Sequence, residues 1–125
     1  DLNLVRGEDS FVRAQWAGEA MLWHIYPQDE QAHLIKLAAW QQRVETVAAA
    51  ANTPMPASWG QMLMTWNHPA TQAGNCQPED WLRFFATLPE IRAALQSWRQ
   101  HLLAQPDLAT QLMRFYADRV ESRPK

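Results

Sequence analysis

Hydrophobic residues recur along this chain at the three- and four-residue spacing of amphipathic helices. In the clearest segment the intervals are three, four, three and four, through Leu88, Ile91, Leu95, Trp98 and Leu102. The longest stripe comprises Leu34, Leu37, Trp40, Val44, Val47 and Ala51. No segment alternates hydrophobic and polar residues over a useful length, so no strand is expected. The pattern predicts an all-α protein, a single compact irregular or orthogonal bundle of about six helices.

Prolines followed by acidic residues mark four helix starts, at Pro27, Pro78, Pro89 and Pro106. Proline fits the first turn of a helix, and negative charge suits its positive N-terminus. Two further starts follow from capping side chains, Ser10 or Asp9 in one helix and Ser58 in another, and Asn52 is expected as a left-handed C-terminal cap. The expected helices cover residues 11–26, 28–51, 58–66, 78–86, 91–104 and 107–120.

The chain is short enough for one domain. With 125 residues and 47% hydrophobic content, it could bury about two-thirds of the surface that the unfolded chain exposes. We therefore expect residues 1–125 to form a single helical domain. Within it, residues 1–9 and 122–125 are predicted to be frayed, and residues 67–77 to form a central loop.

Charge and composition narrow the range of functions only a little. The net charge of −2 and the pI near 6.1 argue against a polyanionic partner, since nucleic-acid-binding domains usually carry a basic excess. The single cysteine excludes an internal disulfide. No run of eighteen apolar residues exists, so the chain contains no predicted membrane span. We expect a cytoplasmic protein, or the soluble domain of a membrane-anchored one, because the chain starts at Asp1 rather than methionine.

No reaction signature stands out. Cys76 and His68 could form a nucleophile and base, but a buried thiol and a helix-ending histidine are the stronger explanation of the two residues. The histidines share no metal-ligand spacing, and the four glycines are isolated rather than grouped in a phosphate loop. The acidic pairs, Glu8-Asp9, Asp29-Glu30 and Glu79-Asp80, all stand at predicted helix starts. The sequence therefore predicts no catalytic residue, no metal site and no cofactor.

Tryptophan is unusually frequent, with seven in 125 residues. Tryptophan and methionine are enriched in the cores of protein interfaces, and they gather on the expected helix at 58–66. The candidate interaction residues are Trp59, Met62, Met64 and Trp66. The alternative is that these side chains form the core of the domain itself.

A helix-turn-helix is a second interpretation of the C-terminal half. The expected helices at 78–86 and 91–104 are separated by a tight turn at Pro89, and Arg92 and Arg99 would be the candidate DNA contacts. Phosphate-contacting residues are few on the second helix, which weakens this interpretation.

The preferred interpretation is a non-catalytic helical protein–protein interaction domain. Its partner would be another protein, with a second copy of the chain as one option, and no small-molecule substrate is evident. The excess of arginine over lysine, nine to two, suggests a bacterial accessory protein, such as the soluble part of a membrane-associated secretion, conjugation or phage-type assembly. The alternatives are a helix-turn-helix DNA-binding regulator and a small Cys/His-dependent enzyme.

Overall fold

The computed structural model describes residues 1–68 and 76–121 of the chain, and it is mostly helical. The elements in chain order are β1 (Leu2–Val5), α1 (Glu8–Ala17), β2 (Ala20–Trp23), a short 3-10 helix η1 (Asp29–Gln31), α2 (Ala32–Ala50), α3 (Ala57–Asn67), α4 (Pro78–Ala86), α5 (Leu88–Leu103) and α6 (Leu108–Glu121). The predicted helical bundle is thus confirmed, with the addition of a small sheet that the sequence pattern did not predict.

The two strands form a parallel pair. Leu2 lies opposite Ala20 and Val5 opposite Trp23, and α1 makes the crossover between the strands. All four residues of β2 are buried. A strand buried on both faces is apolar throughout and does not alternate, which is why the expectation of no strand was wrong.

Gly18 ends α1 well before the predicted boundary at residue 26. Its φ of 68° is left-handed, and its N–H donates to the carbonyl of Ala14 as a C-terminal cap. The second half of the predicted helix 11–26 is therefore β2 and the turn after it. The predicted frayed segment 1–9 is also different, since it holds β1 and the start of α1.

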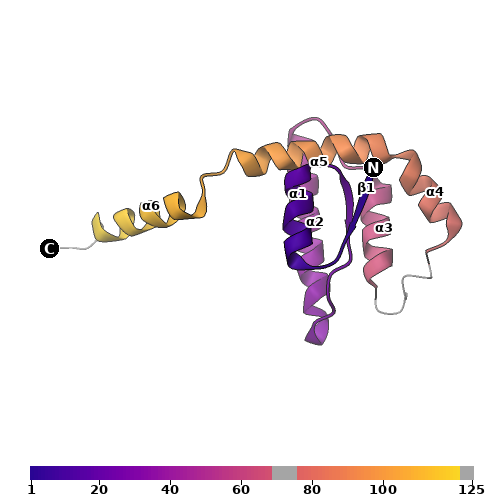
Figure 1. Ribbon diagram of the computed structural model, residues 1–125, viewed down its shortest axis with the longest axis horizontal. Coiled ribbons are helices and arrows are strands. Elements are labelled where there is room, and N and C mark those ends of the chain that lie inside the picture. Colours follow the sequence, from indigo (N-terminus) through magenta and orange to yellow (C-terminus); the bar gives the residue numbers. More distant parts are fainter. Residues whose placement is uncertain (69–75, 122–125) are drawn as a thin grey trace.

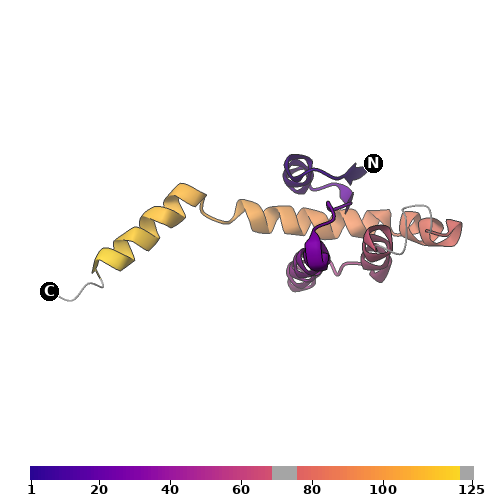
Figure 2. The same cartoon turned by 90° about the horizontal axis from the view of Figure 1, so that it is seen from below.

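Helices α1 and α3 lie on opposite sides of the two strands (Figures 1 and 2), and α3 packs against β2. Helix α5 crosses the end of the sheet where both strands begin (Figure 1), and it packs against α1, α2 and β2. Helix α6 continues beyond α5 and points away from the other elements (Figures 1 and 2).

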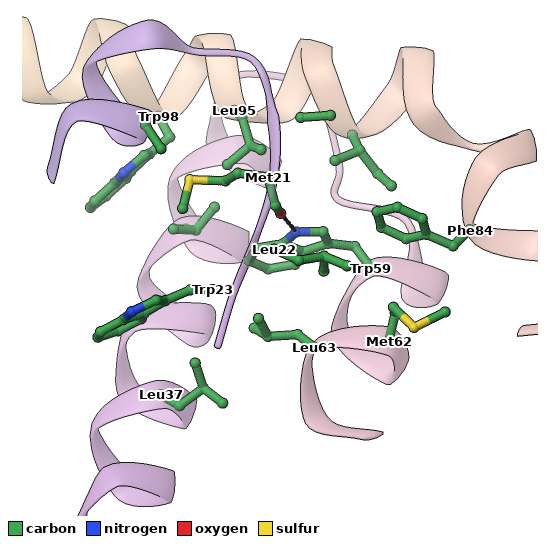
Figure 3. Packing of buried hydrophobic residues seen from close by; sticks show 14 of the residues in the cluster. Met21, Leu22, Trp23, Leu37, Trp59, Met62, Leu63, Phe84, Leu95 and Trp98 are labelled. Atoms are coloured by element: carbon green, nitrogen blue, oxygen red, sulfur yellow. Dashed lines mark hydrogen bonds between the residues drawn. The ribbon is translucent and has the colours of Figure 1, made fainter. Parts of the chain in front are cut away.

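The core is centred on Trp59, which is completely buried. Its indole N–H donates to the carbonyl oxygen of Met21 in β2 over 2.9 Å, as Figure 3 shows. Further aromatic rings continue from it, with Trp40 at 5.5 Å between ring centroids, Trp23 at 5.8 Å from Trp40, and Phe11 stacked on Trp23 at 3.7 Å. These rings join α1, β2, α2 and α3 in one apolar cluster.

Helix boundaries elsewhere follow local signals closely. Helix α4 has the predicted bounds and starts with a capping box between Gln77 and Asp80. Asn52 has the expected left-handed φ of 58° after α2. Ser58 does not cap α3, because its hydroxyl instead bonds to the hydroxyl of Thr87 over 2.6 Å. The predicted tail at 122–125 and most of the predicted loop at 67–77 lie outside the described residues.

In the described ranges, no helix is both long enough and apolar enough to cross a membrane.

Candidate functional site

The carboxyl ends of β1 and β2 lie at one edge of the sheet, because the strands are parallel. In Figure 1 this edge is the end of the sheet that faces away from α5. We call it the carboxyl edge and define it by the residues that follow the strands, Arg6 to Glu8 after β1 and His24 to Gln28 after β2. Ligands of parallel α/β sheets bind outside the carboxyl ends of the strands, so this edge is the first place to look for a site.

Three hydrogen bonds hold the backbone of the carboxyl edge in place. The indole N–H of Trp23 donates to the carbonyl of Arg6 over 3.1 Å, and the N–H of His24 donates to the carbonyl of Val5 over 2.8 Å. The side chain of Asn67, at the end of α3, accepts from the N–H of Ile25 over 2.9 Å. The loops after both strands are therefore fixed to the core.

A pocket of about 50 Å³ opens at this edge. Side chains from β2, α1, α2 and the segments that follow the two strands line it: Arg6, Glu8, Trp23, Ile25, Tyr26, Gln28 and Lys36. The Arg6 guanidinium lies 4.8 Å from the centre of the Tyr26 ring, and the Lys36 ammonium donates to the side-chain oxygen of Gln28 over 2.8 Å. Two cations, a phenol and a carboxylate thus surround one small opening.

The start of α1 carries two carboxylates with different surroundings. Asp9 forms an ion pair with Arg13 at 3.1 Å. Glu8 lines the pocket, and among the described residues its carboxylate has no hydrogen bond or ion pair. The N-cap of α1 is Gly7, which has no side chain to cap the first backbone N–H groups. A ligand at this edge would find both a free carboxylate acceptor and free backbone donors.

A second pocket of about 150 Å³ shares Arg6 with the first. Its lining is mostly apolar: Leu4, Val5, Arg6, Leu22, His24 and Trp66. Burial lowers the pKa of His24 below its usual 6.5, and the charge of Arg6 adds to this effect. His24 is therefore neutral near pH 7, and its ring can offer one donor and one acceptor.

The backbone before α2 is unusual at the same end of the fold. Glu30 and Gln31 both have left-handed φ angles, 53° and 58°. Non-glycine residues in this conformation cost free energy and are enriched at functional sites. The N-terminus of α2 therefore begins from a constrained turn close to the carboxyl edge.

The four candidate interaction residues do not form one exposed surface. Trp59 and Met62 belong to the core, with exposed fractions of 0% and 2%. Met64 and Trp66 are half-buried. The Trp66 ring packs against Trp81 at 5.3 Å and lies 6.2 Å from the ring of His24, so only this residue of the four reaches the candidate site.

The two candidate DNA contacts, Arg92 and Arg99, are both engaged within the domain. Arg92 forms an ion pair with Glu19 at 2.6 Å, and the Nε–H of Arg99 donates to the carbonyl of Trp16 over 2.7 Å. These interactions fasten α5 to the end of α1 and to the turn before β2.

The structure gives no support to the two remaining candidates from the sequence, a reactive Cys76 thiol and a metal site. Burial raises the pKa of the Cys76 thiol, and the nearby charge of Asp80 raises it further, so the reactive thiolate is disfavoured. No group of three or more histidine, cysteine, aspartate or glutamate side chains could hold a metal ion within residues 1–68 and 76–121.

Sequence reasoning missed the carboxyl edge, although two signals pointed to it. The mostly apolar segment Leu2–Val5 is followed by Arg-Gly and then a helix start, and an entirely apolar segment, Ala20–Trp23, follows the glycine turn. Together they have the order of a strand, a helix and a parallel strand. Glu8 was explained entirely by the helix dipole, which accounts for its position but not for its free carboxylate.

Comparison with known proteins gives a consistent result. A family model described as "Elongation-Factor P (EF-P) rhamnosyltransferase EarP" matches residues 1–117. Three relatives named protein-arginine rhamnosyltransferase are 43% identical over 118 residues in Pseudomonas aeruginosa, 42% over 117 in Pseudomonas putida and 36% over 121 in Neisseria meningitidis. The alignments cover 94%, 93% and 92% of this chain but only 29% of each relative.

These comparisons correct the predicted function. The interpretation as a non-catalytic interaction domain of a secretion, conjugation or phage-type accessory protein is wrong, because the relatives are named for an enzymatic reaction. The DNA-binding alternative is wrong for the same reason, and the Cys/His alternative names a different chemistry from glycosyl transfer.

The predictions about partners are corrected only in part. The expectation of a protein partner agrees with the relatives' names, which specify a protein as the acceptor. The expectation of no small-molecule substrate does not agree, because a rhamnosyl transfer requires a rhamnose donor. The suggested membrane anchor has no support in the described helices.

Proposed function

This chain belongs to the EarP family of elongation factor P rhamnosyltransferases, and we propose that it is part of an enzyme that transfers rhamnose to an arginine side chain of elongation factor P. The observation that carries the proposal is the family match over residues 1–117, almost the whole chain. The chain spans 29% of the length of its relatives. An elongation factor works in translation, so we place the reaction in the cytoplasm.

The reaction joins a nitrogen of the arginine guanidinium to the anomeric carbon of rhamnose. As that bond forms, the bond between the anomeric carbon and the leaving group of the donor breaks, and its electron pair departs with the leaving group. The attacking nitrogen loses one proton to a base or to water. The enzyme therefore needs acceptors for the guanidinium or sugar hydroxyl groups and positive charge near the leaving group.

We assign part of this work to the carboxyl edge. The free carboxylate of Glu8 can accept hydrogen bonds from sugar hydroxyls or from the acceptor guanidinium. Arg6 and Lys36 line the same pocket and can offset the negative charge of a departing leaving group. The hydrogen bonds that hold these loops to the core support the assignment, since a transfer site must hold its side chains in a fixed geometry.

The test is rhamnosyl transfer by the full-length enzyme, read as the mass gain of elongation factor P. Glu8→Gln keeps the size of the side chain but removes the charge that strengthens its hydrogen bonds. We expect a loss of about 10- to 100-fold in kcat/KM, the range for one hydrogen bond to a charged group. Separate KM measurements for donor and acceptor show which substrate Glu8 contacts.

A matched control variant helps to distinguish an error in the assigned site from an error in the proposed function. Glu79 is an exposed glutamate in the first turn of α4, and Glu79→Gln should leave kcat/KM unchanged. If Glu8→Gln also left kcat/KM unchanged, the carboxyl edge would be the wrong site while the enzymatic function stood. If the full-length wild-type enzyme transferred no rhamnose to elongation factor P, the function itself would be wrong.

A further inference from the structure

His33 is one of three polar side chains that are buried in the described part of the chain, and the others are Ser58 and Asn67. It stands in the first turn of α2, and its exposed fraction is 5%. Its ring nitrogen Nδ1 accepts a hydrogen bond from the backbone N–H of Gln28 over 3.1 Å. A backbone N–H can only donate, so Nδ1 carries no proton. The neutral ring that this bond requires has its proton on Nε2.

The bond to His33 fixes one end of the segment that follows β2 at the carboxyl edge. Asn67 accepts from the N–H of Ile25 near the start of this segment, and His33 accepts from the N–H of Gln28 near its end. Pro27 lies between the two contacts and has a restricted φ. Two of the three buried polar side chains therefore hold the same short segment, and they reach it from different helices, α3 and α2.

Helix α2 also holds the side chain of Gln28. The Lys36 ammonium, which comes three residues after His33 and so lies on the same side of the helix, donates to Oε1 of Gln28 over 2.8 Å. An ammonium can only donate, so the Gln28 amide is oriented with its oxygen toward Lys36. Its NH2 group makes no hydrogen bond with the described residues, although Gln28 lines the same pocket as Arg6 and Glu8. This donor is therefore available to a ligand in the pocket.

The turn that brings Gln28 to His33 is costly. Glu30 and Gln31 lie between the two residues, and both have left-handed φ angles, which are unfavourable for residues with a Cβ. One neutral hydrogen bond contributes less to stability than two such residues cost. The stability that this bond adds therefore does not explain the turn. Strained backbone of this kind is common at functional sites, and the turn places Gln28 at the pocket.

We propose that His33 is a positioning residue of the transferase, which through the N–H of Gln28 directs the Gln28 amide at the substrate in the pocket. The role rests on the function proposed above, because it needs a substrate at the carboxyl edge. His33 itself is buried and does not line the pocket, so it acts only through Gln28. The guanidinium of the acceptor arginine can only donate hydrogen bonds, so the Gln28 NH2 group suits an oxygen of the rhamnose donor.

The test compares two replacements of His33 in the full-length enzyme, with rhamnosyl transfer to elongation factor P as the readout. His33→Leu removes the acceptor for the Gln28 N–H, whereas His33→Asn offers an oxygen the same number of bonds from Cβ as Nδ1. We expect His33→Leu to lower kcat/KM for the rhamnose donor by about 10- to 100-fold, the loss that a displacement of about 1 Å can cause, and His33→Asn to stay within about threefold of wild type. Equal losses in the two variants would overturn the proposal.

A double variant tests whether His33 acts through Gln28. Gln28→Ala removes the side chain but keeps the backbone N–H, and we expect it alone to lower kcat/KM for the rhamnose donor. Adding His33→Leu should then lower kcat/KM by less than about threefold, because the group that His33 positions is already absent. A full additional loss from His33→Leu would overturn the proposal, and so would an unchanged kcat/KM in Gln28→Ala.

Ser58→Ala controls for a general loss of stability. It removes another buried hydrogen bond, to Thr87, at the end of α3 opposite to Asn67. It should lower the midpoint of urea denaturation and leave kcat/KM unchanged. If Ser58→Ala lowered kcat/KM as much as His33→Leu, destabilisation alone would account for both losses, and the proposal would fall.

Nitrogen NMR of the histidine rings in the wild-type enzyme needs no variant that must fold. Nδ1 of His33 should have the chemical shift of an unprotonated nitrogen, and Nε2 that of a protonated one. A protonated Nδ1 would overturn the proposal.

The role of His33 and the proposed function can fail separately. If the wild-type enzyme transferred rhamnose and Glu8→Gln lost activity while His33→Leu did not, only the role of His33 would be wrong. If the wild-type enzyme transferred no rhamnose to elongation factor P, the proposed function would be wrong, and the role of His33 would fall with it.

Discussion

Asn67 accepts a hydrogen bond from the backbone N–H of Ile25 over 2.9 Å, and both residues are buried. The amide nitrogen of the same side chain donates to the carbonyl of Trp23 over 2.8 Å. One side chain at the end of α3 thus satisfies two backbone groups just where β2 leaves the sheet. The geometry of the carboxyl edge depends on this contact between a helix end and a strand end.

Replacing Asn67 should loosen the carboxyl edge and destabilise the fold. Asn67→Leu leaves the Ile25 N–H and the Trp23 carbonyl buried without partners, each costing about 1–3 kcal/mol. We expect a total loss near 3 kcal/mol in urea denaturation, with Gln61→Ala on the exposed side of α3 as the control. A loss no greater than that of the control would show that the two bonds contribute nothing to stability.

Gln15 should behave as a shared acceptor for two tryptophans. Its side-chain oxygen accepts from the indole N–H of Trp40 over 3.0 Å and of Trp98 over 2.9 Å, which ties α1 to α2 and α5. Gln15→Met removes the acceptor at similar volume and should cost about 2 kcal/mol. Gln15→Glu keeps an oxygen acceptor and should cost clearly less in the same denaturation experiment. Equal losses in the two variants would exclude the hydrogen bonds as the cause.

Gly18 should not tolerate a side chain. Its φ of 68° is left-handed, and an added Cβ would lie 2.7 Å from the Cδ of Arg99. The conformation alone costs a non-glycine residue about 1–2 kcal/mol. We expect Gly18→Ala to lower the free energy of unfolding by at least that amount. Gly7→Ala is the matched control, since Gly7 has an extended backbone and the nearest atom to its Cβ is the Ser10 Oγ at 3.7 Å.

The stability contributed by His24 should depend on pH in a predictable direction. Burial, and then the charge of Arg6, lowers the pKa of His24 in the folded state below 6.5, so the unfolded state binds more protons as the pH falls. The free energy of unfolding should decrease as the pH drops below 6.5. The decrease should end once the pH is below the folded-state pKa. In the His24→Gln variant, denaturation midpoints measured between pH 7.5 and pH 5 should lack this pH-dependent decrease.

An NMR titration of the ring protons tests the two causes separately. Arg6→Gln should raise the pKa of His24 part of the way back, because burial is the larger cause and persists in the variant. A wild-type pKa at or above 6.5 would contradict both the titration and the stability predictions.

Most of the helices could be predicted because their signals are local. Apolar spacing and proline-acid starts located α2, α4, α5 and α6 to within a few residues, and Asn52 was recognised as the left-handed residue after α2. The amphipathic pattern of α6 was also visible, although nothing in the sequence showed that its apolar face would be uncovered.

The sheet and the candidate site were decided by tertiary structure. Strand β2 has four residues, all apolar and buried, and in sequence alone it cannot be told from a continuation of α1. Its partner β1 lies about eighteen positions earlier, and only their parallel pairing places Arg6 and Glu8 beside Tyr26. Tertiary packing also decided that Trp59 belongs to the core. The sequence pattern of an apolar helix face is the same whether the chain itself or a partner covers that face. Local periodicity therefore determined the helices, whereas contacts between distant residues determined where chemistry can occur.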